Sequence, residues 1–329
     1  MRAAKSLLAG VLALVLLGLS ALFTYGHKIN ENIPTWQEIY AKFGIAEEIE
    51  KGEVYDQPFT MSFLDVGQGS ATLIHCKDPN FTMLVDTGEQ GNDGVILDEL
   101  NKLGVKHLDD VVLTHPHADH VGSFPELAKS DISIKYVVMP LLDTDRLGKD
   151  TALYHVVLGA IRTADATIVT AKPGKRITVE SKKTDHKVVI EFLGPVGDKD
   201  KQTDNLNNRS VFVKVTYGDV SVLLTGDGEY AEEMDVVEWL NSEEGQASGI
   251  DPKCTIYEAG HHGSHTSSSR RFLAVIQPKY GIISCGKDND FGHPHESTLT
   301  NFKDINARVY RTDELGTIVI GTDGHTLVN

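Results

Sequence analysis

Two stretches of the chain repeat one pattern, a β-hairpin that closes on Gly and Asp residues and is followed by a helix. Both hairpins consist of short apolar segments typical of strands, and both helical stretches have apolar residues three and four positions apart. This repeat predicts an α/β fold in which two sheets pack face to face with helices outside. The first copy has strands at residues 61–64, 71–75 and 81–85, the residues Asp86-Thr87-Gly88, and a helix with Ile96, Leu100 and Leu103 that stops at Gly104; the second has strands at residues 211–216 and 220–224, the residues Thr225-Gly226-Asp227-Gly228, and a helix with Tyr230, Met234 and Val237.

The length of the chain and its uninterrupted pattern of short strands favour one large domain. The chain has 329 residues, of which 40% are hydrophobic, an ordinary globular composition. From residue 59 onward no stretch rich in Pro, Gly and Ser interrupts the short strands. We therefore predict one domain over residues 58–329, preceded by a polar linker over residues 27–57.

The first 26 residues have the charge order of an export signal. Arg2 and Lys5 precede an apolar run from Leu7 to Phe23. The run predicts an N-terminal hydrophobic helix over residues 1–26, either an uncleaved signal anchor or a cleaved signal peptide. Both alternatives predict an extracytoplasmic protein, anchored to the membrane by this helix or secreted. The three cysteines are too few for a disulfide framework, and either pair or stay buried.

The charge balance limits the partners of the chain. Lys and Arg number 31 against 47 Asp and Glu, a formal net charge of −16. A field of this sign repels phosphate backbones, so we expect no basic face for binding nucleic acids. Phosphate chemistry would need a local positive charge, such as a metal ion.

The densest group of reactive side chains follows the apolar strand at residues 111–114. His115, His117, Asp119 and His120 lie within six residues. Neutral imidazoles and carboxylates suit Zn²⁺ or Mn²⁺, and burying three imidazoles without such partners is costly. The spacing lets His115 and His117 point into one site, while Asp119 and His120 reach a second. The motif predicts one or two divalent cations.

The ordered motifs resemble those of a known family. The histidine cluster after a strand, the earlier Asp-Thr-Gly and the later Leu-Leu-Thr-Gly-Asp are similar to the metallo-β-lactamase superfamily, which has a four-layer αββα sandwich. Within it, the chain over residues 59–325 resembles the hydrolase domain of the ComEC/Rec2 competence proteins and their stand-alone relatives. This closer resemblance rests on Phe-Leu-Asp-Val-Gly-Gln-Gly at residues 63–69, His-His-Gly-Ser-His-Thr-Ser-Ser-Ser at residues 261–269 and Phe-Gly-His-Pro-His at residues 291–295.

The resemblance also implies roles for residues outside the cluster. Asp227 would bridge two cations, and Asp86 would hold a ligand histidine in its tautomer. One of His261 and His262 would be the late histidine ligand; we favour His261, with His262 facing substrate. Further residues expected to contact substrate, donate a proton or support the site are His293, His295, Asn208, Ser264 and Ser267, the two serines in a loop whose following helix can offer N–H groups to a phosphate.

One departure from the wider superfamily concerns the loop at residues 205–210. Many members have a third histidine for the first metal there, whereas this loop reads Asn-Leu-Asn-Asn-Arg-Ser. The competence-type relatives share the asparagine-rich pattern. The departure leaves the first metal site short of a ligand, which predicts a weak site, a site filled only with substrate, or one better suited to Mn²⁺ than to Zn²⁺.

These residues predict metal-assisted hydrolysis, in which a hydroxide held between the cations and oriented by Asp119 attacks the substrate. The resemblance implies that the substrate is a phosphodiester, for which DNA is one candidate, and hence that the protein is a phosphodiesterase or nuclease. Two alternatives remain. The site would hydrolyse a cell-wall phosphoester, as phosphorylcholine esterases do, or a lactone or lactam; or the chain would be a membrane-tethered binding module with a vestigial site.

Overall fold

The computed structural model describes Leu22, residues 47–197 and residues 204–329. The chain divides into two compact units, Met1–Glu48 and Ile49–Asn329. The hydrophobic helix expected over residues 1–26 lies outside the described residues except for Leu22, as does most of the expected linker. No helix among the described residues combines the length and the apolar character needed to cross a bilayer.

The second unit begins at Ile49, nine residues before the boundary expected at residue 58. Ile49 is buried, and its backbone N–H donates to the hydroxyl of Tyr310 at 2.9 Å. Glu50 forms a β-bridge with Val328 near the C-terminus. These contacts join residues 49–57 to the last strands of the unit, a pairing of distant segments that the polar composition of the segment does not reveal.

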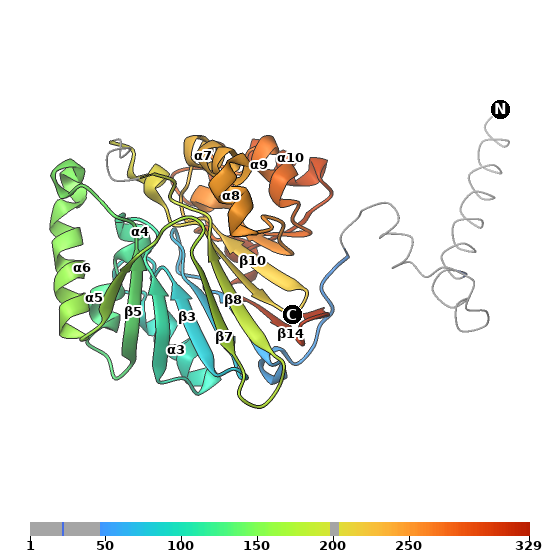
Figure 1. The fold of residues 1–329 in the computed structure, drawn as a ribbon, viewed down its shortest axis with the longest axis horizontal. Coiled ribbons are helices and arrows are strands. Elements are labelled where there is room, and N and C mark those ends of the chain that lie inside the picture. Colours follow the sequence, from blue (N-terminus) through green and yellow to red (C-terminus); the bar gives the residue numbers. More distant parts are fainter. Residues whose placement is uncertain (1–21, 23–46, 198–203) are drawn as a thin grey trace. The chain divides into compact units, whose positions relative to one another are not determined.

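Two sheets form the middle of the unit (Figure 1). The strand order of the first is β15-β14-β1-β2-β3-β4-β5-β6, and that of the second is β13-β12-β11-β10-β9-β8-β7. The first sheet contains β1 (Phe59–Phe63), β2 (Thr72–Cys76), β3 (Phe81–Val85), β4 (His107–Val112), β5 (Ser133–Met139), β6 (Thr167–Thr170), β14 (Ile318–Thr322) and β15 (Leu327–Val328). The second contains β7 (Arg176–Glu180), β8 (Lys187–Phe192), β9 (Val213–Tyr217), β10 (Val220–Leu224), β11 (Ile256–Glu258), β12 (Tyr280–Ile283) and β13 (Arg308–Arg311).

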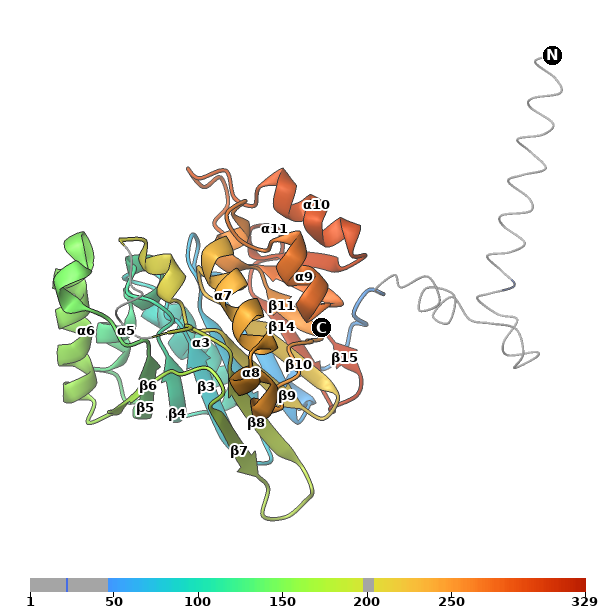
Figure 2. The same cartoon turned by 45° about the horizontal axis from the view of Figure 1, so that its top comes forward.

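Helices cover the outer faces of both sheets (Figures 1 and 2). The first sheet carries α3 (Asp93–Leu103), α4 (Ala118–Val121), α5 (Phe124–Leu127) and α6 (Thr151–Thr163). The second carries α7 (Tyr230–Asn241), α8 (Glu243–Ser248), α9 (Arg270–Ile276) and α10 (Glu296–Asp304). Short turns of helix complete the described elements: η2 (Val54–Asp56), η3 (Thr144–Arg146), η4 (Gly148–Asp150), η6 (Leu206–Arg209), η7 (Gly260–Gly263) and α11 (Thr312–Leu315).

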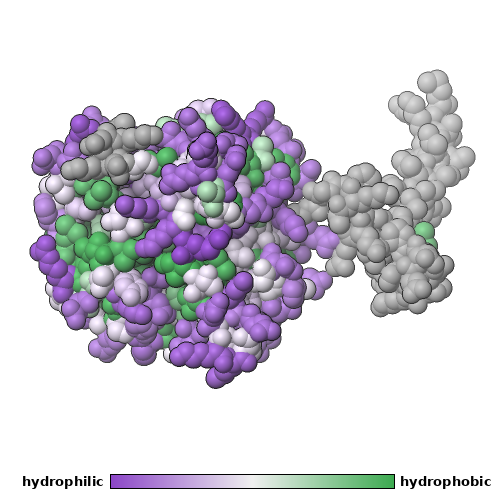
Figure 3. All heavy atoms as spheres, viewed as in Figure 1, coloured by the Kyte–Doolittle hydropathy of each residue, from purple (hydrophilic) through white to green (hydrophobic). Residues whose placement is uncertain are grey.

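Three apolar cores hold these layers together. One lies between the sheets and includes Phe63, Phe192 and Val222. A second lies between the first sheet and α3, α5 and α6, and a third between the second sheet and α7, α9 and α10. The four-layer αββα arrangement predicted above is therefore confirmed. The face in Figure 3 is mostly hydrophilic, and its hydrophobic atoms gather in a band across its middle.

Most of the repeated elements lie where the sequence pattern predicts them. Gly104 ends α3 in the left-handed conformation with φ 70°, as its place after the apolar pattern indicates. In α7, Val237 is buried and Met234 packs against the core as predicted, whereas Tyr230 at the start of the helix is 53% exposed. The three cysteines are free and buried.

The strand directions place the ends of both sheets together. Strands β3 to β6 run parallel in the first sheet, and β10 to β13 run parallel in the second. The segments that follow β4, β10 and β11 contain the histidines and aspartates of interest. Loops after the carboxyl ends of parallel strands are where α/β folds usually bind ligands.

Candidate metal centre

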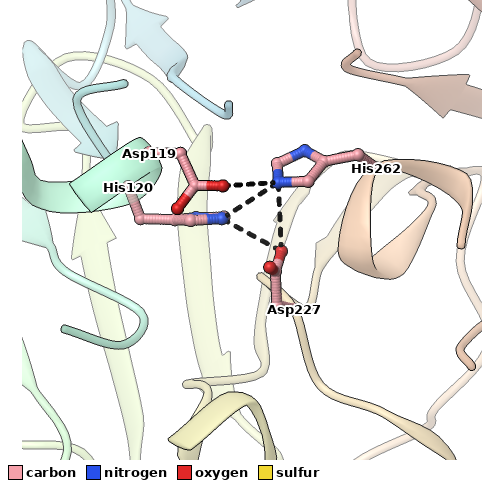
Figure 4. Close-up of side chains that lie close together, drawn as sticks. All are labelled: Asp119, His120, Asp227 and His262. Carbon is pink, nitrogen blue, oxygen red and sulfur yellow. Dashed lines mark hydrogen bonds and ion pairs between the residues drawn. The ribbon is translucent and has the colours of Figure 1, made fainter. Parts of the chain in front are cut away.

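Side chains from both sheets meet in one cluster (Figure 4). His115 follows β4, Asp119 and His120 belong to α4, Asp227 follows β10, and His262 follows β11. The segment after β10 comes so close to the segment after β4 that position 226 must be glycine. Gly226 has φ 50°, and a Cβ there would lie 2.5 Å from the Thr114 hydroxyl oxygen. Asp227 is thereby brought beside the histidines of the first sheet.

Four residues form the first ligand group: Asp119, His120, Asp227 and His262. One ligand atom from each lies within 4.8 Å of the others. Asp227 Oδ1 is 3.0 Å from His120 Nε2 and 3.5 Å from His262 Nε2. Asp119 Oδ2 lies 3.3 Å from the same His262 nitrogen. Two carboxylates and two imidazoles in this arrangement suit a divalent cation.

His115, His117 and Asp227 form a second ligand group, at the site that the sequence predicts to be short of a ligand, and one ligand atom from each again lies within 4.8 Å of the others. His115 Nε2 is 3.0 Å from His117 Nδ1 and 3.7 Å from Asp227 Oδ2. Asp227 therefore belongs to both groups, with Oδ1 nearer the first and Oδ2 nearer the second. A carboxylate that offers one oxygen to each of two groups can bridge two cations.

Hydrogen bonds to the Nδ1 atoms of His262, His120 and His115 show which ring nitrogen carries the proton. His262 Nδ1 is 2.9 Å from the Ser284 carbonyl oxygen, which can only accept a hydrogen bond, so Nδ1 carries the proton. His120 Nδ1 lies 2.7 Å from Asp86 Oδ2, which accepts its proton. His115 Nδ1 faces the Thr114 hydroxyl at 3.1 Å, and this hydroxyl donates to Asp86. In the neutral rings, all three Nε2 atoms therefore have lone pairs directed into the cluster.

These lone pairs are the test of whether a cation fits. His120 Nε2 and His262 Nε2 face each other at 3.3 Å with Asp227 Oδ1 beside them. All three are buried, and electron pairs brought this close repel unless a proton or a cation lies among them. The donor set therefore fits a divalent metal ion.

The charges of the cluster couple its protonation to metal binding. Burial opposes a charge on His120, but the carboxylates of Asp227, Asp86 and Asp119 raise its pKa well above the usual value. For His262, Asp227 and Asp119 likewise outweigh burial and raise the pKa. Burial lowers the pKa of His115 well below its usual value, and His120 adds to the effect. Without a cation, protons on His120 and His262 balance the carboxylates, and a cation must displace them.

The late histidine pair lies in a strained turn, η7. His261 and His262 have φ of 51° and 55°, in the left-handed region that non-glycine residues rarely adopt. This turn directs His262 into the buried ligand group, whereas the sequence led us to favour His261. His261 Nε2 lies 3.7 Å from Asp227 Oδ2, on the side of His115. The geometry therefore favours His262 as a ligand of the first group and leaves His261 facing the second.

Two acidic residues that the sequence did not single out lie beside His117 and His261. Asp150 Oδ2 lies 3.7 Å from His117 Nε2, the nitrogen opposite the one that faces His115. Glu229 Oε1 lies 3.5 Å from His261 Nδ1. Amide groups of Asn205 and Asn207 donate to the Glu229 carboxylate at 2.9 and 3.0 Å. Acidic residues are too common in this chain for either to be recognised from the sequence.

Asn208 supports the site indirectly. Its side-chain oxygen accepts from the backbone N–H groups of Glu229 and Glu232 at the start of α7. The residue therefore fixes the helix that follows Asp227 and Glu229.

Hydrogen bonds within the protein hold the serine loop in place. The Ser267 hydroxyl is buried and donates to the Gly228 carbonyl at 2.8 Å. The Ser264 hydroxyl accepts from Thr266 within the same loop. The Ser269 N–H, at the start of α9, faces the Glu233 carboxylate at 3.2 Å. These hydrogen bonds hold the loop together, and the contact of Ser264 and Ser267 with an anion stays a prediction.

His293 and His295 lie beside the cluster rather than in either ligand group. The His293 ring is buried and lies 5.6 Å from the ring of His261 and 6.2 Å from that of His262. Burial and the neighbouring histidines lower its pKa to about 4. His295 stands one step further out, with its ring 5.0 Å from His293 and its Nδ1 accepting from the His265 N–H.

The family of the chain follows from comparison with known proteins. Residues 64–287 match the model of the metallo-beta-lactamase superfamily, and the chain therefore belongs to this superfamily. Its fold and its two His/Asp groups are those of a metal-dependent hydrolase of this class.

Within this superfamily, the chain is similar to proteins of bacterial competence. The chain is similar to ComE operon protein 3 of Bacillus subtilis (29% identity over 274 residues, 78% of this chain and 32% of that protein). It is also similar to competence protein ComA of Neisseria gonorrhoeae (29% over 259 residues, 78% and 31%). The chain thus spans about a third of the length of these relatives. Among solved structures, a metal-dependent hydrolase of the β-lactamase superfamily aligns with a TM-score of 0.46 at 15% identity, covering 80% of this chain and 99% of that one.

Proposed function

We propose that the protein is an extracytoplasmic phosphodiesterase of the nuclease type that works with two divalent cations, Zn²⁺ or Mn²⁺. The observation that carries the proposal is the position of Asp227, whose two oxygens face two separate ligand groups. Paired cations bridged in this way stabilise the attacking and the leaving oxygens of a phosphoryl centre. The similarity to competence proteins supports DNA as a substrate.

Each group of side chains has a part in this proposal. His115, His117 and Asp227 Oδ2 would hold one cation, with His261 as a further ligand. Asp119, His120, His262 and Asp227 Oδ1 would hold the other.

When bound, such cations act as Lewis acids and lower the pKa of water toward neutrality. Asp119 is the most exposed member of its group, with a third of its side chain accessible, so its carboxylate is placed to orient the attacking water. His293 borders the cluster and is placed to contact the departing part of the substrate.

The test is hydrolysis by the purified full-length protein with added Mn²⁺ or Zn²⁺. The substrates are single- and double-stranded DNA, a simple aryl phosphodiester, a phosphomonoester and an aryl ester of phosphorylcholine. We expect diester cleavage that is abolished in His117→Ala and retained in His155→Ala, whose histidine is exposed on α6. Equal turnover by His117→Ala, or cleavage of the phosphorylcholine ester alone, would contradict the proposal.

Metal content separates an enzyme from a vestigial binding module. About two equivalents of cation per chain, with loss of one in His117→Ala, fit the proposed centre. A protein that binds no cation after reconstitution would instead be a binding module.

The proposed location rests on the N-terminal residues, where Arg2 and Lys5 precede the apolar run. Protease added to intact cells should degrade the domain from outside if it is membrane-anchored, and the protein should be in the medium or the periplasm if it is secreted. Full protection within the cytoplasm would contradict this part of the proposal.

A further inference from the structure

The loop after β12 presents one exposed aromatic ring beside the metal centre. Phe291 is 65% exposed, and one face of its ring stacks on His293 with the centroids 5.6 Å apart and 23° between the planes. His293 in turn lies 6.2 Å from the ring of His262, a member of the first ligand group. Phe291 is therefore one ring removed from the cluster, with its other face open to solvent.

The loop around Phe291 is held in one shape by Asn289. The side-chain oxygen of Asn289 accepts from the N–H groups of Phe291 and His293 at 3.2 and 2.9 Å. Its amide group donates to the carbonyls of Gly286 and His293 at 2.9 and 2.7 Å. A ring mounted on such a loop loses little conformational freedom when a ligand binds to it.

The inner side of the loop is tied to the first sheet by Gln68. Its side-chain oxygen accepts from the Gly286 N–H at 3.1 Å, and its amide group lies 3.3 Å from His293 Nδ1. Gln68 belongs to the loop between β1 and β2, so a residue of the first sheet's loops helps to fix the position of Phe291, which we call the platform.

The net charge of the chain decides which interaction this ring can contribute. At −16, the protein repels a polyanion at long range, so affinity must come from the cations and from contacts that need no charge. Stacking of an unpaired base on an aromatic side chain is such a contact, and it tolerates any base because every base has a π-face.

Resting on the function proposed above, we propose that Phe291 is a specificity-determining residue that stacks an unpaired nucleobase, so that the enzyme selects single-stranded over double-stranded nucleic acid. The phosphate next to the stacked base then lies over the two ligand groups. In a duplex the bases stack on one another and are closed to Phe291. A quaternary ammonium fits this ring less well, because recognition of such groups uses a cage of several aromatic rings.

The experiment compares the full-length native protein with Phe291→Ala and with Tyr136→Ala, a change of another exposed aromatic on strand β5. The probes are a fluorescently labelled short oligothymidylate, an abasic oligomer of the same length, and the oligothymidylate paired with its complement. Binding is measured by fluorescence anisotropy without added metal and with Ca²⁺, and cleavage is measured with Mn²⁺.

For Phe291→Ala we expect the Kd and KM of the oligothymidylate to rise about 5- to 160-fold, the range that one stacked base spans. The kcat, the abasic oligomer and the duplex should change little, and Tyr136→Ala should resemble the native protein. Phe291→Trp should bind the oligothymidylate at least as tightly as the native protein.

Equal effects of Phe291→Ala on the oligothymidylate and the abasic oligomer, or no effect on either, would overturn the stacking proposal. An effect confined to a phosphorylcholine ester would overturn it in favour of an ammonium site. Stacking-dependent binding without any cleavage would refute the proposed phosphodiesterase while leaving the platform in place, so the two proposals can fail separately.

Discussion

The substitution Asp86→Asn isolates the contribution of one buried carboxylate to the metal centre. Asp86 is 1% exposed and has φ 59°, a left-handed conformation that asparagine also tolerates. Its Oδ1 accepts from the Thr114 N–H at 2.8 Å, and its Oδ2 accepts from the Thr114 hydroxyl at 2.6 Å and from His120 Nδ1 at 2.7 Å. The amide has the same shape, so the backbone and the packing are preserved.

The expected effect follows from the direction of one hydrogen bond. In Asp86→Asn, Oδ1 still accepts from Thr114, and the amide N–H group faces His120 Nδ1. Two donors cannot share this contact, so His120 adopts the other tautomer and carries its proton on Nε2, which points at Asp227 Oδ1. Loss of such an outer partner typically weakens metal binding by about 10- to 100-fold, or about 1.4 to 2.7 kcal/mol.

The measurement is titration of the metal-free protein with Zn²⁺ in competition with a chromophoric chelator. We expect the weakened ion to be the one held by His120, with the other affected less. The matched control is Asp150→Asn, since Asp150 Oδ2 lies 3.7 Å from His117 Nε2, beyond direct hydrogen-bond distance, and its effect should be smaller. Unfolding of both variants in chelator reports any loss of fold separately. A folded Asp86→Asn protein with native Zn²⁺ affinity would refute the tautomer argument.

Three further predictions test the fold and its electrostatics. Zn²⁺ affinity should fall as the pH is lowered, because carboxylates raise the pKa of His120 and of His262 and a cation must displace their protons; calorimetry in buffers of different ionisation enthalpy should detect proton release, and a pH-independent affinity would contradict this. Burial raises the pKa of Glu233 from 4.5 to about 7, so the folded state binds the proton more tightly and stability is lost as the pH rises between these values. Glu233→Gln should therefore raise the free energy of unfolding at pH 8 by up to about 3 kcal/mol relative to its effect at pH 4, as measured by urea unfolding, and an equal effect at both pH values would argue against it. Gly226→Ala should destabilise the metal-free protein by at least about 1 to 3 kcal/mol in the same assay, since its φ is 50° and its Cβ would press on Thr114; native stability would show that the two halves can separate at little cost.

The fold and the first histidine cluster could be predicted because the relevant signals are local. The hairpins are continuous in sequence, and His115 to His120 lie next to one another after a strand. Asp227 follows the second hairpin, but Gly-Asp is also a common turn, so its role was predicted from the family resemblance. In each case a short segment contains both the element and the side chain that the element positions.

The remaining parts of the site depend on contacts that no short segment contains. The choice between His261 and His262 is decided by a left-handed turn, in which adjacent side chains leave the backbone in different directions. Asp150 meets His117 only because the start of α6 lies near the first cluster. The boundary at Ile49 likewise depends on strands at the far end of the chain.

The asparagine-rich loop at residues 205–210 contacts the metal centre indirectly, through the carboxylate of Glu229. At this loop the side-chain amides of Asn205 and Asn207 donate to the two carboxylate oxygens of Glu229. The Thr266 hydroxyl is the hydrogen-bond partner of His261 Nδ1 at 3.0 Å, with Glu229 Oε1 at 3.5 Å, and the opposite nitrogen of that ring faces Asp227 Oδ2. The His261 imidazole thus approaches Asp227 from the turn after β11. An outer partner fixes the orientation of a histidine ring, so Thr266 and Glu229 together hold the other ring nitrogen of His261 toward Asp227.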